Sequence, residues 1–195
     1  MSFEKNKYQV IRQAIPKDLA NFVMNYFLLQ QDAVAYMLKN NIINKHNPLI
    51  GNWEDEQVPN AYAKYADWVM ETLLQYVRPI MKEKTKLDLI PTYSYARIYN
   101  KGNILKKHKD RPSCEISTTL NLGGNHWSIY LEGIKVDLQQ GDMLIYSGCE
   151  LEHWREPFEG DFCVQVFLHY NHANGKFGKE NLFDKRPILG IPKNG

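Results

Sequence analysis

The sequence predicts an α+β protein in which helices come first and an antiparallel sandwich or barrel of short strands follows. Before residue 86, apolar residues recur at intervals of three and four, which is typical of amphipathic helices. From residue 87 the interval changes to two, and turns containing glycine separate several short runs, which indicates antiparallel strands. We therefore expect a single domain in residues 1–195, with a mainly helical part (1–86), a strand-rich core (87–170) and a tail (171–195).

The helical part contains two candidate helices. The first begins near Pro16, where a missing N–H is tolerated, and its apolar spacing continues to residues 36–38. The second keeps helical spacing over residues 62–80, and Pro79 is expected to kink or end it. A short strand is expected within residues 8–15. The polar segment 40–56 predicts a long loop, either a lid or an irregular linker.

The strand-rich core shows clear alternation. Tyr93, Tyr95, Arg97 and Tyr99 fall on one face of a predicted strand, and a second strand covers residues 116–122. Further strands are expected at residues 127–131, 134–138, 143–146 and 162–170. The tail is rich in Gly, Asn and Lys, and it predicts loops that cover one edge.

Composition excludes several classes of protein. The net charge of +2 argues against nucleic acid as an electrostatically captured partner. Three cysteines without a C-x-x-C motif argue against a disulfide framework or a zinc cluster and favour a reducing compartment. The N-terminus lacks the apolar core of a signal peptide, and no run approaches the ~18 apolar residues of a membrane span. We expect a cytoplasmic protein with no membrane partner, and its oligomeric state stays open.

A candidate metal site lies at His108 and Asp110. Side chains two residues apart on an extended strand point the same way, so this imidazole and carboxylate can bind one ion from one side. A second, distant histidine would complete the facial triad of non-haem Fe(II) oxygenases, which leaves coordination positions open. The candidate is His153, just after the predicted strand 143–146. The alternative is an exposed loop histidine, a turn-stabilising Asp110 before Pro112, and an unrelated core histidine.

The surroundings of these residues resemble the 2-oxoglutarate- and Fe(II)-dependent oxygenases of the prolyl 4-hydroxylase type, over roughly residues 90–170. The segment 117–122 resembles the family's next core strand, and the other histidines are expected to be structural or exposed. The matching motifs are Tyr99-x-x-Gly102, His108-x-Asp110 and the Gly-Asp-led strand at residues 141–146.

The resemblance implies a double-stranded β-helix, or jelly-roll, core with the N-terminal helices packed on it. It implies Fe(II) and 2-oxoglutarate as cofactors, with ascorbate as a further candidate, and His108, Asp110 and His153 as the catalytic metal ligands. The implied reaction is hydroxylation of an aliphatic C–H in a peptidyl proline, a free amino acid or a similar small substrate, with succinate and CO₂ as co-products. Two alternatives stay open: a non-catalytic jelly-roll binding module, and a cupin-like metal enzyme that does not use 2-oxoglutarate.

One departure from the family concerns the cosubstrate carboxylate. The family usually carries a Lys or Arg about ten residues after the distal histidine, but Cys163 stands there. Because a buried carboxylate without a cation is costly, another cation is expected. Arg155 is the first candidate, since it follows His153 by two residues and its fork suits a carboxylate. Arg97 is the reserve. The alternative for Arg155 is a surface ion pair with a nearby acidic residue.

Three further residues are candidates for the cosubstrate pocket. The resemblance implies that Tyr99 donates its hydroxyl to 2-oxoglutarate, whereas the alternative is an ordinary core tyrosine. Thr119 and Asn121 share a polar strand face, and they would line the cavity if that face points inward. If it points outward, they lie on a solvent-facing side of the strand.

Overall fold

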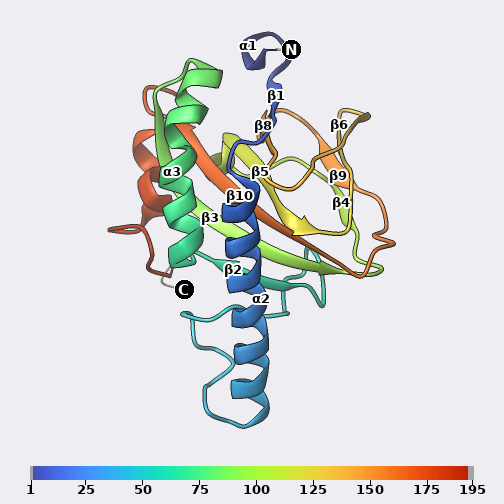
Figure 1. Ribbon diagram of the computed structural model, residues 1–195. Coiled ribbons are helices and arrows are strands. Elements are labelled where there is room, and N and C mark those ends of the chain that lie inside the picture. The colour runs from blue at the N-terminus through green and yellow to red at the C-terminus, as the bar shows by residue number, and fades with distance from the viewer. Residues whose placement is uncertain (1, 193–195) are drawn as a thin grey trace.

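The computed structural model describes residues 2–192 (Figure 1), so residue 1 and the end of the predicted tail, residues 193–195, lie outside the described range. In chain order its elements are α1 (Phe3–Asn6), β1 (Tyr8–Ile11), α2 (Lys17–Lys39), β2 (Tyr62–Tyr65), α3 (Trp68–Thr85), β3 (Leu89–Asn100), β4 (Leu105–His108), the 3₁₀ helix η1 (Pro112–Cys114), β5 (Ile116–Gly124), β6 (Ile129–Leu131), β7 (Ile134–Val136), β8 (Met143–Ser147), β9 (His153–Arg155), β10 (Phe162–His172) and the 3₁₀ segment η2 (Lys179–Lys185).

The strands of the described residues form two antiparallel sheets. The larger has six strands in the order β1-β8-β5-β10-β3-β2, and the smaller has four in the order β4-β9-β6-β7. β10 is the centre of the larger sheet, because it pairs with β3 on one side and β5 on the other. An apolar cluster joins the sheets, with Ile129 and Leu131 from the smaller one and Leu144 and Tyr146 from the larger. This is the jelly-roll core that the sequence predicts.

The helices α2 and α3 cover the outer face of the larger sheet (Figure 1), with α2 on β5 and α3 on β3 and β10. The alternation of β3 explains how the two sides differ. Ala96 and Ile98 belong to the apolar core that includes residues of both helices. Tyr95 and Arg97, on the opposite side of the strand, line a cavity next to the smaller sheet. The predicted α+β class, with N-terminal helices packed on a strand core, is confirmed.

Helix α2 begins directly after Pro16, as predicted, and ends at Lys39. Its buried stripe consists of Ala20, Val23, Phe27 and Val34, which is the amphipathic pattern that the sequence shows. The strand before it is shorter than the predicted segment and ends at Ile11. No helix within residues 2–192 combines the length and the apolar character that crossing a membrane requires.

The second predicted helix needs two corrections. Its first part, Tyr62–Tyr65, is the edge strand β2, and the helix begins only at Trp68, after Asp67 caps its first turn by accepting from the Val69 and Met70 N–H groups. Pro79 lies inside the helix and does not end it. The turns beyond Pro79 bury further side chains against the core, and this packing outweighs the hydrogen bond that proline removes.

The tail after β10 packs on strand β3 through η2 and so covers part of the sheet, as predicted. Its backbone is unusual, because Phe183, Asp184 and Lys185 are consecutive and have φ values of 51°, 55° and 66°. Residues other than glycine rarely adopt this left-handed conformation, so strong local contacts must hold it.

Candidate metal centre

The three predicted ligands come together at one end of the smaller sheet. β4 and β9 pair so that His108 stands directly opposite His153, and the two ring centroids are 4.2 Å apart. Asp110 follows β4, and its Oδ1 lies 3.7 Å from His108 Nε2 and 3.5 Å from His153 Nε2. The ligand atoms of the three residues all lie within 4.8 Å of one another, a spacing that one metal ion can bridge.

Both imidazoles are oriented for metal binding. His108 Nδ1 lies 2.8 Å from the Lys106 carbonyl, and His153 Nδ1 lies 3.0 Å from the Leu151 carbonyl. A proton on each Nδ1 satisfies these contacts, so that each Nε2, once it carries no proton, could bind a metal ion. Burial lowers the pKa of His108, which favours the neutral form that binds metals.

The Asp110 carboxylate is fixed from the other side. Its backbone N–H donates to the Gly148 carbonyl (2.9 Å), and its Oδ2 accepts from Ser117 Oγ (2.8 Å), so Oδ1 is left for the imidazoles. A Cβ at Gly148 would collide with Asp110 Oδ2 and the Cys114 carbonyl oxygen, so the site needs glycine there. Burial alone would raise the pKa of Asp110, but the hydrogen bond and charge of His153 outweigh it and the pKa is lowered.

A second polar cluster lies behind Asp110. His169 Nδ1 is 2.9 Å from Ser117 Oγ, and burial lowers the pKa of His169 to about 4. Asp110, Cys114 and His169 also bring ligand atoms within 4.8 Å of one another. His169 is not among the predicted ligands. Its position next to the triad follows only from the pairing of β10 with β5, which places it opposite Ser117.

The triad opens into a cavity of about 400 Å³. Much of its wall is aromatic, and the tyrosine hydroxyls on this wall have partners behind it. Tyr65 donates to Asp184, and Tyr95 donates to Asp55. The large side chains of the wall are Tyr65, Tyr93, Tyr95, Leu105, Tyr146 and Phe167.

Arg155 lies inside the protein and not on its surface. It is 1% exposed, and it shares the buried face of β9 with His153. Its guanidinium donates to the Trp127 carbonyl, lies 3.4 Å from Thr119 Oγ1 and stacks 5.0 Å from the Trp127 ring. Its Nε has no hydrogen-bond partner, and within residues 2–192 no carboxylate forms an ion pair with it. A buried, uncompensated guanidinium of this kind is suited to an anionic ligand.

Arg155 also lies close to the position where the family resemblance places a basic residue. Burial raises the pKa of the Cys163 thiol, and the positive charge of Arg155 opposes that rise. Gln165 links the two neighbourhoods, because it donates to Cys163 Sγ and accepts from Thr119 Oγ1 (3.1 Å). A buried cation of β9 therefore lies near the place on β10 where the resemblance implies a basic residue.

The remaining predicted cosubstrate residues differ in their surroundings. Neither Thr119 nor Asn121 lines the cavity, and neither does Arg155. Thr119 is fully buried beside Arg155, whereas Asn121 uses its amide on the Leu138 carbonyl and the Gly123 N–H. Neither residue faces solvent. The hydroxyl of Tyr99 accepts from Arg97 (3.3 Å), and its ring contacts Trp127.

Arg97, the reserve cation, already has a carboxylate partner. It forms an ion pair with Asp55, inside the predicted loop 40–56, and donates to Gln57 Oε1 (3.2 Å), which directly follows that loop. The Gln57 amide nitrogen also lies 3.2 Å from His108 Nε2. The segment before β2 therefore contacts the triad at His108, and no local sequence pattern identified Asp55 or Gln57.

The fold described here is that of the 2-oxoglutarate-dependent non-haem oxygenases, a group that includes prolyl 4-hydroxylases of known structure. No family model and no curated protein matches the sequence. The likeness is therefore one of structure, and it confirms the predicted resemblance at the level of the fold.

Three crystal structures illustrate this likeness. A Pseudomonas putida prolyl-4-hydroxylase has a TM-score of 0.58 and 14% identity, over 87% of this chain and 95% of that one. The α-ketoglutarate-dependent epimerase SnoN from nogalamycin biosynthesis has a TM-score of 0.67 and 10% identity, over 100% and 93%. HygX from Streptomyces hygroscopicus, with nickel and 2-oxoglutarate bound, has a TM-score of 0.60 and 10% identity, over 98% and 94%.

Proposed function

We propose that this protein is a 2-oxoglutarate- and Fe(II)-dependent dioxygenase that hydroxylates an aliphatic C–H of a small substrate. The observation that carries the proposal is the convergence of His108 Nε2, His153 Nε2 and Asp110 Oδ1 at the wall of the cavity. Two imidazoles and one carboxylate on one side of an ion are the donor set of non-haem Fe(II) oxygenases. The carboxylate also distinguishes the site from cupins, which often carry closely spaced histidines instead.

The residues of the chain have defined roles in this proposal. His108, Asp110 and His153 would hold Fe(II), and Ser117 and the two backbone carbonyls would keep the ligands in orientation. Bound Fe(II) would supply dioxygen activation, coupled to the conversion of 2-oxoglutarate to succinate and CO₂. The aromatic wall would exclude water and hold the substrate C–H near the open side of the triad.

Arg155 is the residue that we propose for the far carboxylate of 2-oxoglutarate, with Thr119 beside it. The support is its burial, its unpartnered Nε and its lack of a carboxylate within the described residues. Arg97 is a weaker candidate, because Asp55 already compensates its charge. Tyr99 would act indirectly, through its hydrogen bond with Arg97.

The size of the cavity favours a compact substrate. About 400 Å³ has to accommodate both 2-oxoglutarate and the part of the substrate that reacts. A free amino acid, a similar small molecule or a single prolyl side chain of a peptide would fit such a space. The three cysteines are free, which supports a site of action in the reducing cytoplasm.

The test of the proposed function is an anaerobic titration with Fe(II) and then 2-oxoglutarate, followed by visible absorption. The chelate should produce a charge-transfer band that saturates near one equivalent, and admission of oxygen should then produce succinate. Asp110→Ala should lose Fe(II) binding, whereas Asp137→Ala, which removes an exposed carboxylate paired with His126, should keep it. Fe(II) binding without the band would favour the cupin-like alternative, and no metal binding would favour the binding module.

Arg155 gives the sharpest test of the cosubstrate site. Replacing Arg155 by Met should raise the 2-oxoglutarate concentration needed for half-saturation by about tenfold or more, because a buried carboxylate would lose its charged partner. Arg12→Met is the control, since Arg12 is an exposed arginine whose partner is the buried Asp142, and neither residue is a candidate for the metal or cosubstrate site. An unchanged 2-oxoglutarate requirement in Arg155→Met would rule out this role.

A further inference from the structure

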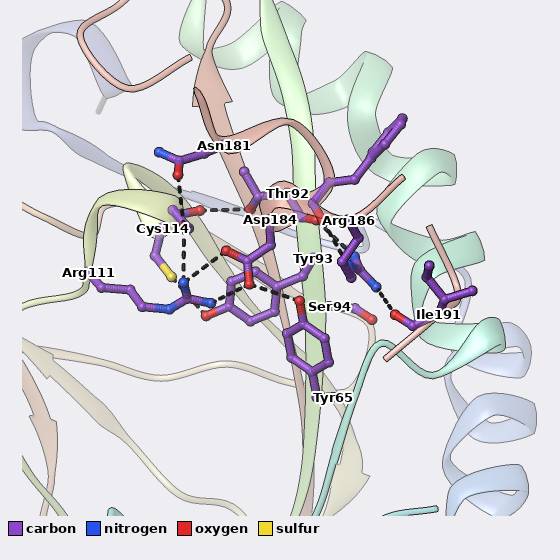
Figure 2. A network of polar contacts seen from close by, with 12 residues as sticks. Tyr65, Thr92, Tyr93, Ser94, Arg111, Cys114, Asn181, Asp184, Arg186 and Ile191 are labelled. Carbon is purple, nitrogen blue, oxygen red and sulfur yellow. Dashed lines mark hydrogen bonds and ion pairs between the residues drawn. The ribbon is translucent and has the colours of Figure 1, made fainter. Parts of the chain in front are cut away.

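The C-terminal tail reaches the loop that carries the metal ligand Asp110. Figure 2 shows the contact: the Asp184 carboxylate lies between Arg111 on one side and Tyr65 on the other. Arg111 forms a fork with it, with NH1 2.9 Å from Oδ1 and NH2 2.8 Å from Oδ2. Asp184 is 1% exposed, whereas the Arg111 side chain is 44% exposed, so this is a charge-assisted pair in which only the carboxylate is buried.

Arg111 is the residue directly after Asp110, so the pair acts on the metal-binding loop itself. The same guanidinium donates to Ser113 Oγ (3.0 Å) and stacks 4.6 Å from the Tyr93 ring on the cavity wall. Thr92 donates to the Ser113 carbonyl (2.7 Å), which fastens the loop to β3. These contacts fix the loop on its outer side, while Gly148 and Ser117 fix Asp110 on its inner side.

The tail adopts a costly backbone to deliver Asp184 to this place. Three consecutive residues, Phe183 to Lys185, are left-handed, a conformation that is unfavourable for residues other than glycine. Such conformations persist only where the surrounding contacts over-determine them. Asp184 is the central residue of the three, and its contacts with Arg111 and Tyr65 are among those that hold the turn.

We propose that Asp184 is a positioning residue of the metal centre: through Arg111 it holds the loop in which Asp110 presents Oδ1 to His108 and His153. This inference rests on the proposed function, because it takes Asp110 to be a metal ligand. In this proposal the C-terminal tail supports a metal site whose ligands lie much earlier in the chain.

A second ion pair of the same tail provides a matched control. Arg186 NH2 lies 2.7 Å from Glu71 Oε1 on α3, and both side chains are buried. This pair also fastens the tail, but its carboxylate lies on helix α3, at the outer face of the sheet, and not on the metal loop. Arg186 donates in addition to the Thr92 carbonyl of β3 (3.0 Å). Loss of either pair should weaken the tail, and only loss of the Asp184 pair should disturb the metal site.

The experiment compares Asp184→Asn and Glu71→Gln with the wild type. Each protein is titrated with Co(II) alone, the visible d–d absorption is recorded, and stability is measured by urea unfolding. Both variants should be destabilised. Asp184→Asn should bind Co(II) about tenfold to a hundredfold more weakly and with an altered d–d spectrum, as expected when support of a ligand is lost. Glu71→Gln should keep the wild-type affinity and spectrum.

The outcomes separate the possible failures. Wild-type affinity and spectrum in Asp184→Asn would overturn the inference, and so would an equal loss in both variants, because the tail would then act through general stability. No Co(II) binding by the wild type would instead overturn the metal site of the proposed function. If Asp184→Asn does not fold, Arg111→Lys takes its place: it keeps the charge but loses the fork, and wild-type Co(II) binding would again overturn the inference.

Discussion

The orientation of one carboxylate decides whether the triad can form. Asp110 has two oxygens, and Ser117 occupies Oδ2, so only Oδ1 faces the imidazoles. The space around Oδ2 is filled on its far side by the backbone of Gly148. A side chain at residue 148 would therefore push the carboxylate toward the position that the metal needs.

We predict that Gly148→Ala weakens Fe(II) or Co(II) binding by about tenfold or more, because the new methyl group displaces Asp110 and breaks its contact with Ser117. The φ angle of Gly148 is not in the left-handed region, so the effect should come from the collision and not from the backbone. Metal titration with near-UV circular dichroism of the metal-free protein checks this. Wild-type metal affinity in a folded Gly148→Ala would contradict it.

The sequence identified those site residues whose signal is local. His108 and Asp110 are two positions apart on a strand end, and the same spacing of two placed Arg155 beside His153. Asp184 and Gln57 could not be found in this way, because they meet Arg111 and His108 across 73 and 51 residues of chain. Such contacts depend on the complete tertiary fold.

Helix α3 shows how tertiary packing overrides a local signal. Proline inside a helix removes a backbone hydrogen bond and crowds the preceding turn. For this reason the sequence predicted that Pro79 would kink or end the helix. The helix continues because Met81 and Thr85, beyond the proline, are buried.

We predict that Pro79→Ala stabilises the protein by roughly 1–3 kcal/mol, because it restores a helical hydrogen bond and relieves the crowding. Urea unfolding of the two proteins measures the difference, with the metal-binding affinity as a control that should not change. A destabilised Pro79→Ala would show that proline is needed there, for instance because it lowers the conformational entropy of the unfolded chain.

The predicted start of α3 was wrong for a different reason. Tyr62 and Tyr65 fit a helical interval of three, yet they form an edge strand against β3. Aromatic residues favour strands, and Asp67 is a good N-cap, so both signals pointed to a later start of the helix. The apolar spacing alone could not decide between the two structures, because the segment is short.

Two carboxylates that are paired with arginines, Asp55 and Asp184, link the stability of the whole protein to pH. Burial would raise the pKa of Asp55 and of Asp184, but Arg97 and Arg111 respectively outweigh it, and both pKa values are lowered. A carboxyl group whose pKa is lower in the folded state stabilises the protein above its unfolded pKa of about 4. That contribution is lost as the pH falls through the folded pKa.

We predict that the free energy of unfolding falls steeply below about pH 4, and that it falls less steeply in Asp184→Asn, by up to about 1.4 kcal/mol per pH unit. Urea unfolding of both proteins between pH 7 and the acid range measures the two slopes. Parallel slopes would mean that Asp184 does not titrate with a lowered pKa in the folded protein.

The pairing of His108 with His153 affects which strands of the protein unfold first. β4 and β9 are short strands joined by few backbone contacts, and a shift of one residue between them would present Trp154 in place of His153. An ion bound to both histidines would stabilise this register of β4 and β9. We expect the metal-free protein to exchange its β4 and β9 amide protons well before those of β3 and β10, and the metal-bound protein to protect both sheets alike.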